Sequence, residues 1–184
     1  MRHALLLSMM LICGSAQAAC EGSLLEVDAK RLLGASESLC QYRGKALLVV
    51  NTASQCGYTP QYEELEALWR DYRGRGLVVL GFPSDQFGGQ EFDDDVEIAK
   101  FCKVNFGVSF PMYGKSAVTG DAAHPLFRKL AAATASPPRW NFHKYLIGRD
   151  GRTVSAYGSD VRPQSRELRA AIEQALAAPA ARRP

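Results

Sequence analysis

Two almost continuous apolar runs constrain the fold of this chain more than any other feature of its sequence. Residues 45–51 read KALLVVN and residues 77–82 read LVVLGF, without alternation of apolar and polar side chains. Such runs are typical of strands in a sheet whose two faces are both covered by other elements. We therefore predict two buried strands at these positions.

The segment between the two runs has the pattern of an amphipathic helix, because apolar residues recur at helical spacing with charged residues between them. Pro60 can occupy the first turn of this helix, and Gly74 and Gly76 are expected to end it. The apolar positions are Tyr62, Leu65, Leu68, Trp69 and Tyr72. A strand, a helix and a second strand then make a βαβ unit, which is expected to be right-handed.

A second and a third helix are expected after this unit. Asp93, Asp94 and Asp95 follow a glycine-rich loop, and negative charge is favourable at a helix N-terminus. Pro125 can begin the third helix. The side chains expected to face the core are Val96, Ala99 and Phe106 in the second helix and Leu126, Phe127 and Leu130 in the third.

The C-terminal part predicts an antiparallel hairpin and a last helix. Residues 141–147 and 153–157 flank a GRDG turn, and Ser165 can cap the helix that follows. The complete order is typical of an α/β protein with a thioredoxin-like fold, in which a mixed central β-sheet is flanked by helices on both faces. We assign this domain to residues 20–178 and a flexible tail to residues 179–184.

The first 19 residues are predicted to be a cleaved signal peptide. A basic start precedes the apolar run of residues 4–13, and the small-residue stretch AQAA places cleavage near Ala18 or Ala19. The run is too short to span a bilayer, so we expect a periplasmic or secreted protein without stable membrane insertion. The alternatives are a buried N-terminal helix and a lipoprotein acylated at Cys20.

Charge and histidine content argue against two classes of function. The formal net charge is only +3 and no long basic run occurs, so we expect no nucleic-acid partner. His3, His124 and His143 are scattered, and no cluster of cysteine and histidine has metal-ligand spacing. We therefore expect neither a bound metal nor another resident cofactor.

Four cysteines remain after loss of the signal peptide, which carries Cys13. Four cysteines allow three pairings. An oxidising compartment preserves disulfides, and we favour a bond between Cys20 and Cys40 that closes a short N-terminal loop. In the chain-entropy view such a bond stabilises the fold by ~3 kcal/mol. Cys56 and Cys102 lie in different surroundings.

Cys56 stands between a buried strand and a helix that Pro60 can begin. The free N–H groups and positive dipole of a helix N-terminus favour a thiolate, the nucleophilic form of cysteine. No C-x-x-C motif is present, so the dithiol chemistry of thioredoxin has no local partner thiol. Cys102 is the other candidate in the domain body, either as the thiol that captures a sulfenic acid at Cys56 or as a small core residue.

Three stretches of the chain resemble the signatures of glutathione peroxidases. They are VVNTASQCGYTPQYEELEAL around Cys56, LGFPSDQFGGQE after the second strand, and WNFHKYLIGRDG near the hairpin. They occur in the order of that family, and the resemblance covers the domain from about Leu24 to Leu176. It implies a catalytic tetrad of Cys56, Gln90, Trp140 and Asn141. The indole and amide N–H groups are donors suited to stabilising a thiolate and orienting a peroxide.

The departures from the family pattern indicate which branch of the family the chain resembles. Ser84 stands where many members have a cysteine, and Phe92 replaces a usual proline. The segment of residues 131–139 is short, whereas tetrameric, glutathione-using members are longer there. The chain therefore resembles the monomeric, cysteine-containing branch, in which a cysteine at the position of Cys102 resolves the disulfide. In that branch a thioredoxin-like protein, rather than glutathione, is the usual reductant.

The sequence thus predicts a peroxidase that reduces hydrogen peroxide or organic hydroperoxides and depends on an external thiol reductant. Two other functions are weighed against it. A periplasmic thiol–disulfide exchange protein is disfavoured by the missing C-x-x-C motif. A non-catalytic binding domain of thioredoxin-like fold is disfavoured by the presence of Gln90, Trp140 and Asn141.

Overall fold

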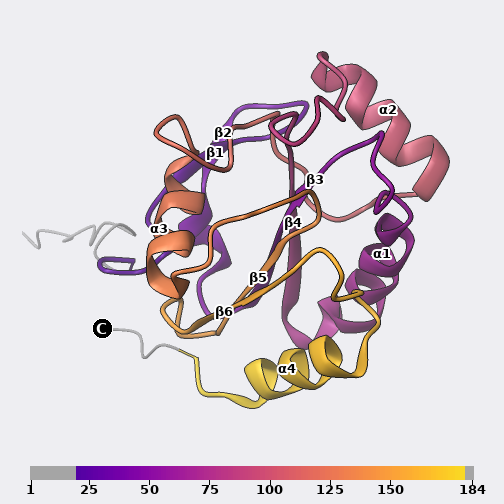
Figure 1. The fold of residues 1–184 in the computed structure, drawn as a ribbon. Coiled ribbons are helices and arrows are strands. Elements are labelled where there is room, and N and C mark those ends of the chain that lie inside the picture. Colours follow the sequence, from indigo (N-terminus) through magenta and orange to yellow (C-terminus); the bar gives the residue numbers. More distant parts are fainter. Residues whose placement is uncertain (1–19, 181–184) are drawn as a thin grey trace, which may run out of the picture.

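A mixed four-stranded sheet lies at the centre of the structure, a computed structural model that describes residues 20–180 (Figure 1). The strands are β3 (Ala46–Thr52), β4 (Leu77–Pro83), β5 (Lys144–Ile147) and β6 (Val154–Tyr157), in the order β4-β3-β5-β6. β3 and β4 are parallel, whereas β5 pairs antiparallel with both β3 and β6. Every residue of β3 and β4 is buried, which confirms the two strands predicted from the apolar runs.

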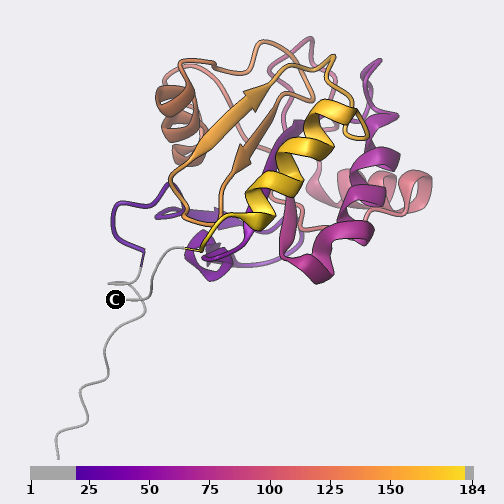
Figure 2. The same cartoon turned by 90° about the horizontal axis from the view of Figure 1, so that it is seen from below.

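Helices cover both faces of the sheet, which confirms the predicted fold class (Figures 1 and 2). They are α1 (Gln61–Tyr72), α2 (Asp95–Phe106), α3 (Pro125–Thr134) and α4 (Arg166–Ala177). Because side chains alternate along a strand, Leu48 and Val50 of β3 pack in one core with α1, α2 and α4. Leu47 and Val49 pack in the other core with α3.

The helix boundaries follow from local chemistry. The Asp94 side chain accepts hydrogen bonds from the N–H groups of Val96 and Glu97, and so caps α2. The Ser165 side chain caps α4 through the N–H of Leu168, as predicted. The turn 73–75 after α1 is a short 3-10 helix, η2 (Arg73–Arg75), which ends at a left-handed Gly76.

The N-terminal part contains two elements that were not predicted, a small antiparallel hairpin and a 3-10 turn. The hairpin consists of β1 (Asp28–Lys30) and β2 (Ser36–Ser38), and the turn is η1 (Leu39–Tyr42). Strands of three residues carry too little alternation to give a periodic signal. A disulfide joins Cys20 to Cys40, the pair favoured from the sequence, and so attaches the start of the domain to η1.

Three local predictions are wrong. Val96 was expected in the core but is 61% exposed, because α2 turns Ile98 and Cys102 inward, whereas Ala99 and Phe106, also expected to face the core, are partly buried against it. The first strand of the hairpin begins at Lys144 rather than at residue 141, because residues 140–143 form a turn. Pro60 precedes α1 as its N-cap instead of lying in its first turn, with helical φ and ψ of −57° and −17°.

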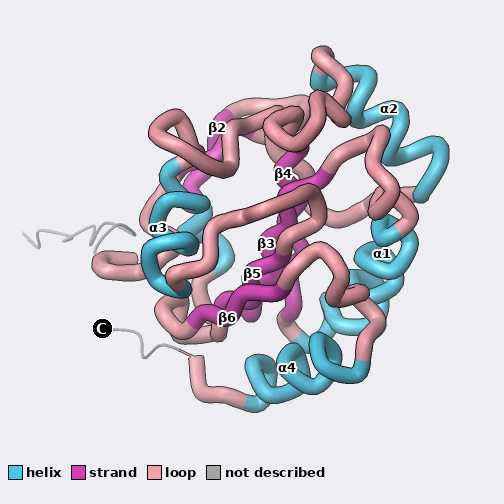
Figure 3. The backbone as a smooth tube through the Cα atoms, viewed as in Figure 1, coloured by secondary structure: helices cyan, strands magenta, loops and turns pink. Residues whose placement is uncertain are grey.

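One long loop connects β4 to α2 and carries Gln90 (Figure 3). A second long loop connects α3 to β5 and carries Trp140 and Asn141. The predicted signal peptide, residues 1–19, and the last four residues of the predicted tail lie outside the described residues. Within residues 20–180 no helix is both long and apolar enough to cross a membrane.

Candidate active site

Cys56 lies in the turn that connects β3 to α1, just beyond the carboxyl end of the central strand. Its backbone N–H donates to Thr59 Oγ1 at 3.0 Å, and Thr59 Oγ1 donates to the Ala53 carbonyl at 2.8 Å. The Cys56 sulfur accepts the Tyr58 N–H at 3.4 Å, a contact that stabilises negative charge on sulfur. The residue is buried, at 7% exposure, so the turn holds a largely enclosed thiol.

The glycine-rich loop after β4 places Gln90 against this turn. The Gln90 carbonyl accepts the Gln55 N–H at 2.9 Å, one residue before Cys56. The side chain of Gln90 reaches the other way, and its Oε1 accepts Asn141 Nδ2 at 3.0 Å. Gln90 therefore links the backbone of the Cys56 turn to Asn141.

Asn141 is fully buried and fixes two points of the glycine-rich loop. Besides Gln90, its Nδ2 donates to the Phe87 carbonyl at 3.3 Å. Trp140, its neighbour, is 41% exposed, and its ring lies 5.9 Å from that of Phe87 between centroids. The structure thus brings Gln90 and Asn141 into direct contact and places Trp140 at the exposed rim of the same loop.

A backbone turn in an uncommon conformation presents Trp140 and Asn141. Phe142 has φ of 61°, in the left-handed region that non-glycine residues rarely adopt. Its N–H donates to the Asn51 carbonyl at 2.7 Å, and Asn51 Nδ2 donates to the Trp140 carbonyl at 3.1 Å. The turn is therefore anchored to the last residues of β3, next to the segment that carries Cys56.

A buried lysine supports this turn and was not identified as a site residue from the sequence. Lys144 is completely buried, and its Nζ donates to the Phe142 carbonyl at 2.7 Å. Burial lowers the pKa of this amine to about 7, although Asp160 and Glu64 act in the opposite direction. The sequence feature that could have identified it is a lysine in a strand whose other residues are apolar or aromatic, KYLI.

Cys102 lies on α2, 2% exposed, in the same apolar core as Cys56, and both are free thiols. Burial raises the pKa of the Cys102 thiol to about 11, and the negative charge of Glu91 adds to the increase. The Tyr62 hydroxyl acts in the opposite direction. Cys102 is therefore a protonated thiol at neutral pH in this arrangement.

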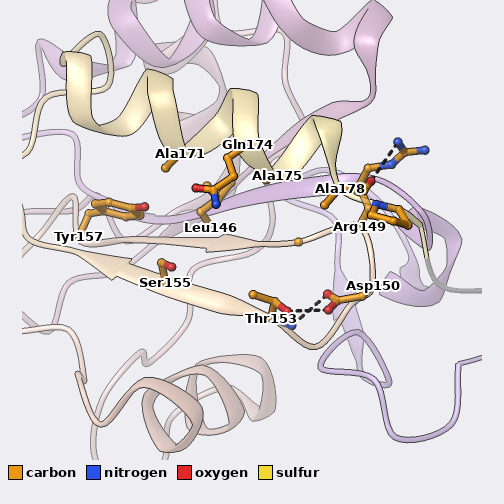
Figure 4. Close-up of a pocket in the computed structure, with 12 residues that line it drawn as sticks. Leu146, Arg149, Asp150, Thr153, Ser155, Tyr157, Ala171, Gln174, Ala175 and Ala178 are labelled. Carbon is orange, nitrogen blue, oxygen red and sulfur yellow. Dashed lines mark hydrogen bonds between the residues drawn. The ribbon is translucent and has the colours of Figure 1, made fainter.

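Two other features of the described residues bear on ligand binding. In residues 20–180 no three residues among histidine, cysteine, aspartate and glutamate gather as a metal site. A groove of about 510 Å³ lies between α4 and the β5–β6 hairpin and extends from Tyr157 to Arg149 (Figure 4). None of the predicted catalytic residues lines it.

Comparison with known sequences identifies the relatives of this chain. Residues 24–131 match the sequence profile of the family described as Glutathione peroxidase. The hydroperoxy fatty acid reductase gpx1 of Synechocystis is 45% identical over 159 residues, which cover 81% of this chain and 93% of the relative. The thioredoxin/glutathione peroxidase BtuE of Escherichia coli is 38% identical over 181 residues, covering 85% and 99% of the two chains.

Solved structures give the same relationship. The apo crystal structure of Trgpx superposes with a TM-score of 0.71 at 35% identity and covers 87% of this chain and 99% of its own. A thiol:disulfide interchange protein of the thioredoxin family from Chlorobium tepidum superposes with a TM-score of 0.62 at 14% identity, with 81% and 92% covered. The second similarity shows the shared fold alone.

Proposed function

This chain belongs to the glutathione peroxidase family and is a thiol peroxidase, and we propose that Cys56 is the residue with which it reduces hydroperoxides. The observation that carries the assignment to Cys56 is its turn. The sulfur accepts a backbone N–H, and the residue is slightly exposed. Its neighbour Gln55 donates a backbone hydrogen bond to the Gln90 carbonyl.

In the first step the Cys56 thiolate attacks the terminal oxygen of a hydroperoxide. The O–O bond breaks, the sulfur becomes a sulfenic acid, and the departing oxygen takes a proton to leave as water or an alcohol. Trp140 Nε1 and Gln90 Nε2 are the donors proposed to orient the peroxide and stabilise the charge on the departing oxygen, while Asn141 acts by holding Gln90. The Asn141 bonds to Gln90 and Phe87 hold this loop in place before the peroxide arrives.

In the second step the Cys102 sulfur attacks the sulfenic sulfur, a disulfide forms between Cys56 and Cys102, and water leaves. One dithiol, or two molecules of a monothiol such as glutathione in succession, then reduces this disulfide by exchange and returns both thiols. We propose a thioredoxin-like protein or glutathione as the reductant, in line with the name of the Escherichia coli relative, thioredoxin/glutathione peroxidase. The substrates proposed are hydrogen peroxide and organic hydroperoxides, a class that includes the one named for the Synechocystis relative.

We also propose that the protein is exported, that its signal peptide is cleaved near Ala18 or Ala19, and that the mature protein is a monomer. The apolar start of the sequence and the disulfide between Cys20 and Cys40 support this location, because disulfides persist in oxidising compartments. The same disulfide argues against acylation of Cys20, since a thioether-linked lipid needs the sulfur that is bonded to Cys40.

Single-turnover oxidation tests the assignment. The protein is mixed with one equivalent of peroxide and its thiols are followed by mass spectrometry, with dimedone to trap sulfenic acid. Cys56→Ser is expected to consume no peroxide, whereas Cys102→Ser should consume one equivalent, accumulate dimedone-reactive Cys56 and fail to cycle with thioredoxin. Normal cycling of the Cys102→Ser protein contradicts the resolving role.

Insulin reduction separates this function from thiol–disulfide exchange. Because Cys56 has no partner thiol within one helical turn, the wild-type protein is expected to reduce insulin no faster than the Cys56→Ser variant. Rapid insulin reduction that requires Cys56, together with no consumption of peroxide, would favour the exchange protein instead.

A further inference from the structure

The two peptide carbonyls that flank Asn141 are each held by a buried side chain. Asn51, near the end of β3, donates its Nδ2 to the Trp140 carbonyl at 3.1 Å. Lys144, at the start of β5, donates its Nζ to the Phe142 carbonyl at 2.7 Å. Both donor residues are completely buried. Since β3 and β5 are neighbours in the sheet, the turn is held from two adjoining strands.

This turn needs support because its backbone conformation is an uncommon one. Phe142 has φ of 61°, which is costly for a residue with a side chain. Its ring is fully buried and meets that of Tyr62 edge-on, with 5.4 Å between centroids, whereas Trp140, two residues earlier, is 41% exposed. The left-handed residue thus allows the phenyl ring to face the core and the indole to face the rim. A turn that relaxed to a common conformation would move the indole.

The lysine is an expensive choice for one of the two donors. Lysine is almost never completely buried unless it is paired with a carboxylate. Within residues 20–180 Lys144 forms no ion pair, and burial lowers the pKa of its amine to about 7. In the same part of the chain its one hydrogen bond is the bond to the Phe142 carbonyl. An apolar side chain of similar length would fill this space without the cost of burying a charge, so the bond itself is what the position requires.

The turn that these residues hold also governs Gln90. Asn141 Nδ2 donates to Gln90 Oε1 at 3.0 Å, so a shift of the turn would be passed to the Gln90 amide. Asn51 adds a second bond to the turn, because its carbonyl accepts the Phe142 N–H at 2.7 Å. Its own strand leads directly into the segment that carries Cys56. Asn51 therefore ties the turn to the strand that positions the reactive sulfur.

We propose that Asn51 and Lys144 are positioning residues for the oxidation of Cys56. This inference rests on the proposed function, in which the Cys56 sulfur reduces a hydroperoxide. By holding the turn, the two residues fix the peroxide donors Trp140 and Gln90 in place. They exchange no proton with the peroxide and act only through the turn. Reactions of Cys56 that need no donor to a departing oxygen should therefore not depend on them.

The test compares two reactions of the same sulfur in the Cys102→Ser background, each followed at Cys56 by mass spectrometry. One is oxidation by hydrogen peroxide, with dimedone to trap the sulfenic acid. The other is alkylation by iodoacetamide at the same pH, which depends on the thiolate but breaks no O–O bond. In Lys144→Met, peroxide oxidation should be about tenfold slower, because a hydrogen bond from a charged group is lost. Alkylation should stay at the rate of the parent.

Lys129→Met is the matched control. Lys129 also donates its amine to a backbone carbonyl, that of Glu26 at 3.0 Å, but in an exposed contact of α3. Both of its rates should equal those of the parent. If Lys144→Met does not fold, Asn51→Ser takes its place, with the same slower oxidation and unchanged alkylation expected.

Two outcomes overturn the proposal. One is peroxide oxidation at the parent rate in Lys144→Met, or in the variant that takes its place. The other is an equal fall of both rates, because the residue would then act on the thiolate itself or on the fold rather than on the peroxide donors. A parent protein whose Cys56 is alkylated but not oxidised by peroxide contradicts the proposed function instead.

Discussion

The bonds of Asn141 give the sharpest quantitative prediction for the candidate site. Its Nδ2 donates to Gln90 Oε1 at 3.0 Å and to the Phe87 carbonyl at 3.3 Å, and the side chain is fully buried. Asn141→Ala removes both bonds and leaves both acceptors without a donor. At about 1 kcal/mol for each bond, the loss of about 2 kcal/mol corresponds to a rate about 30-fold lower if the bonds act in the transition state.

The rate concerned is the second-order oxidation of Cys56 by hydrogen peroxide, measured in the Cys102→Ser background so that sulfenic acid accumulates. Asn105→Ala is the matched control, because Asn105 also donates an amide to a carbonyl, that of Phe101 at 2.9 Å, but is exposed on α2. Its oxidation rate should match that of the parent. If Asn141→Ala, still folded, oxidises within about threefold of the parent, Asn141 does not organise the reactive site.

Three other predictions follow from the same contacts. Replacing Cys20 and Cys40 by serine removes a bond across 20 residues, which should lower the free energy of unfolding by about 3 kcal/mol in a denaturant titration without changing Cys56 oxidation. Lys144, whose pKa falls from 10.5 unfolded to about 7 folded, binds more protons in the unfolded state between these values, so stability rises with pH. In Lys144→Met the free energy of unfolding should therefore rise by about 1–2 kcal/mol less between about pH 7 and about pH 8.5, as measured by urea unfolding. If the free energy of unfolding depends on pH equally in both proteins, Lys144 is not buried as described. Hydrogen exchange should be faster in α2, which buries only Ile98 and Cys102, than in α1, which buries six residues, and equal protection would show that α2 does not open independently.

The parts of the fold that could be predicted are those that local pattern specifies. β3 and β4 lie where the apolar runs are, since a strand buried on both faces has few positions for polar residues. The N-cap Ser165 and the acidic start of α2 were predictable because capping and charge at a helix end act between close neighbours in sequence. The tetrad positions came from the family resemblance rather than from any periodicity.

The parts that could not be predicted depend on contacts between distant segments. Phe142 adopts a left-handed backbone because Asn51, far away in the sequence, holds its N–H. Lys144 and Glu91 are charged residues in the interior, which sequence pattern assigns to the surface. Only the packing of the loops at the end of β3 reveals that both are enclosed next to the reactive segments.

The placement of Cys102 makes sense when helix packing and thiol chemistry are considered together. A resolving thiol that stayed exposed beside Cys56 would compete for peroxide or pair with other thiols, whereas burial on α2 keeps it protonated and unreactive. Burial on a well-packed helix, however, would prevent it from reaching Cys56. α2 meets both needs, because only two of its residues are buried, the others that pack against the core are only partly covered, and Val96 and Val104 face solvent. The thin packing of α2 is therefore a condition of the proposed mechanism, and variants that fill this interface should stabilise the protein while slowing disulfide formation.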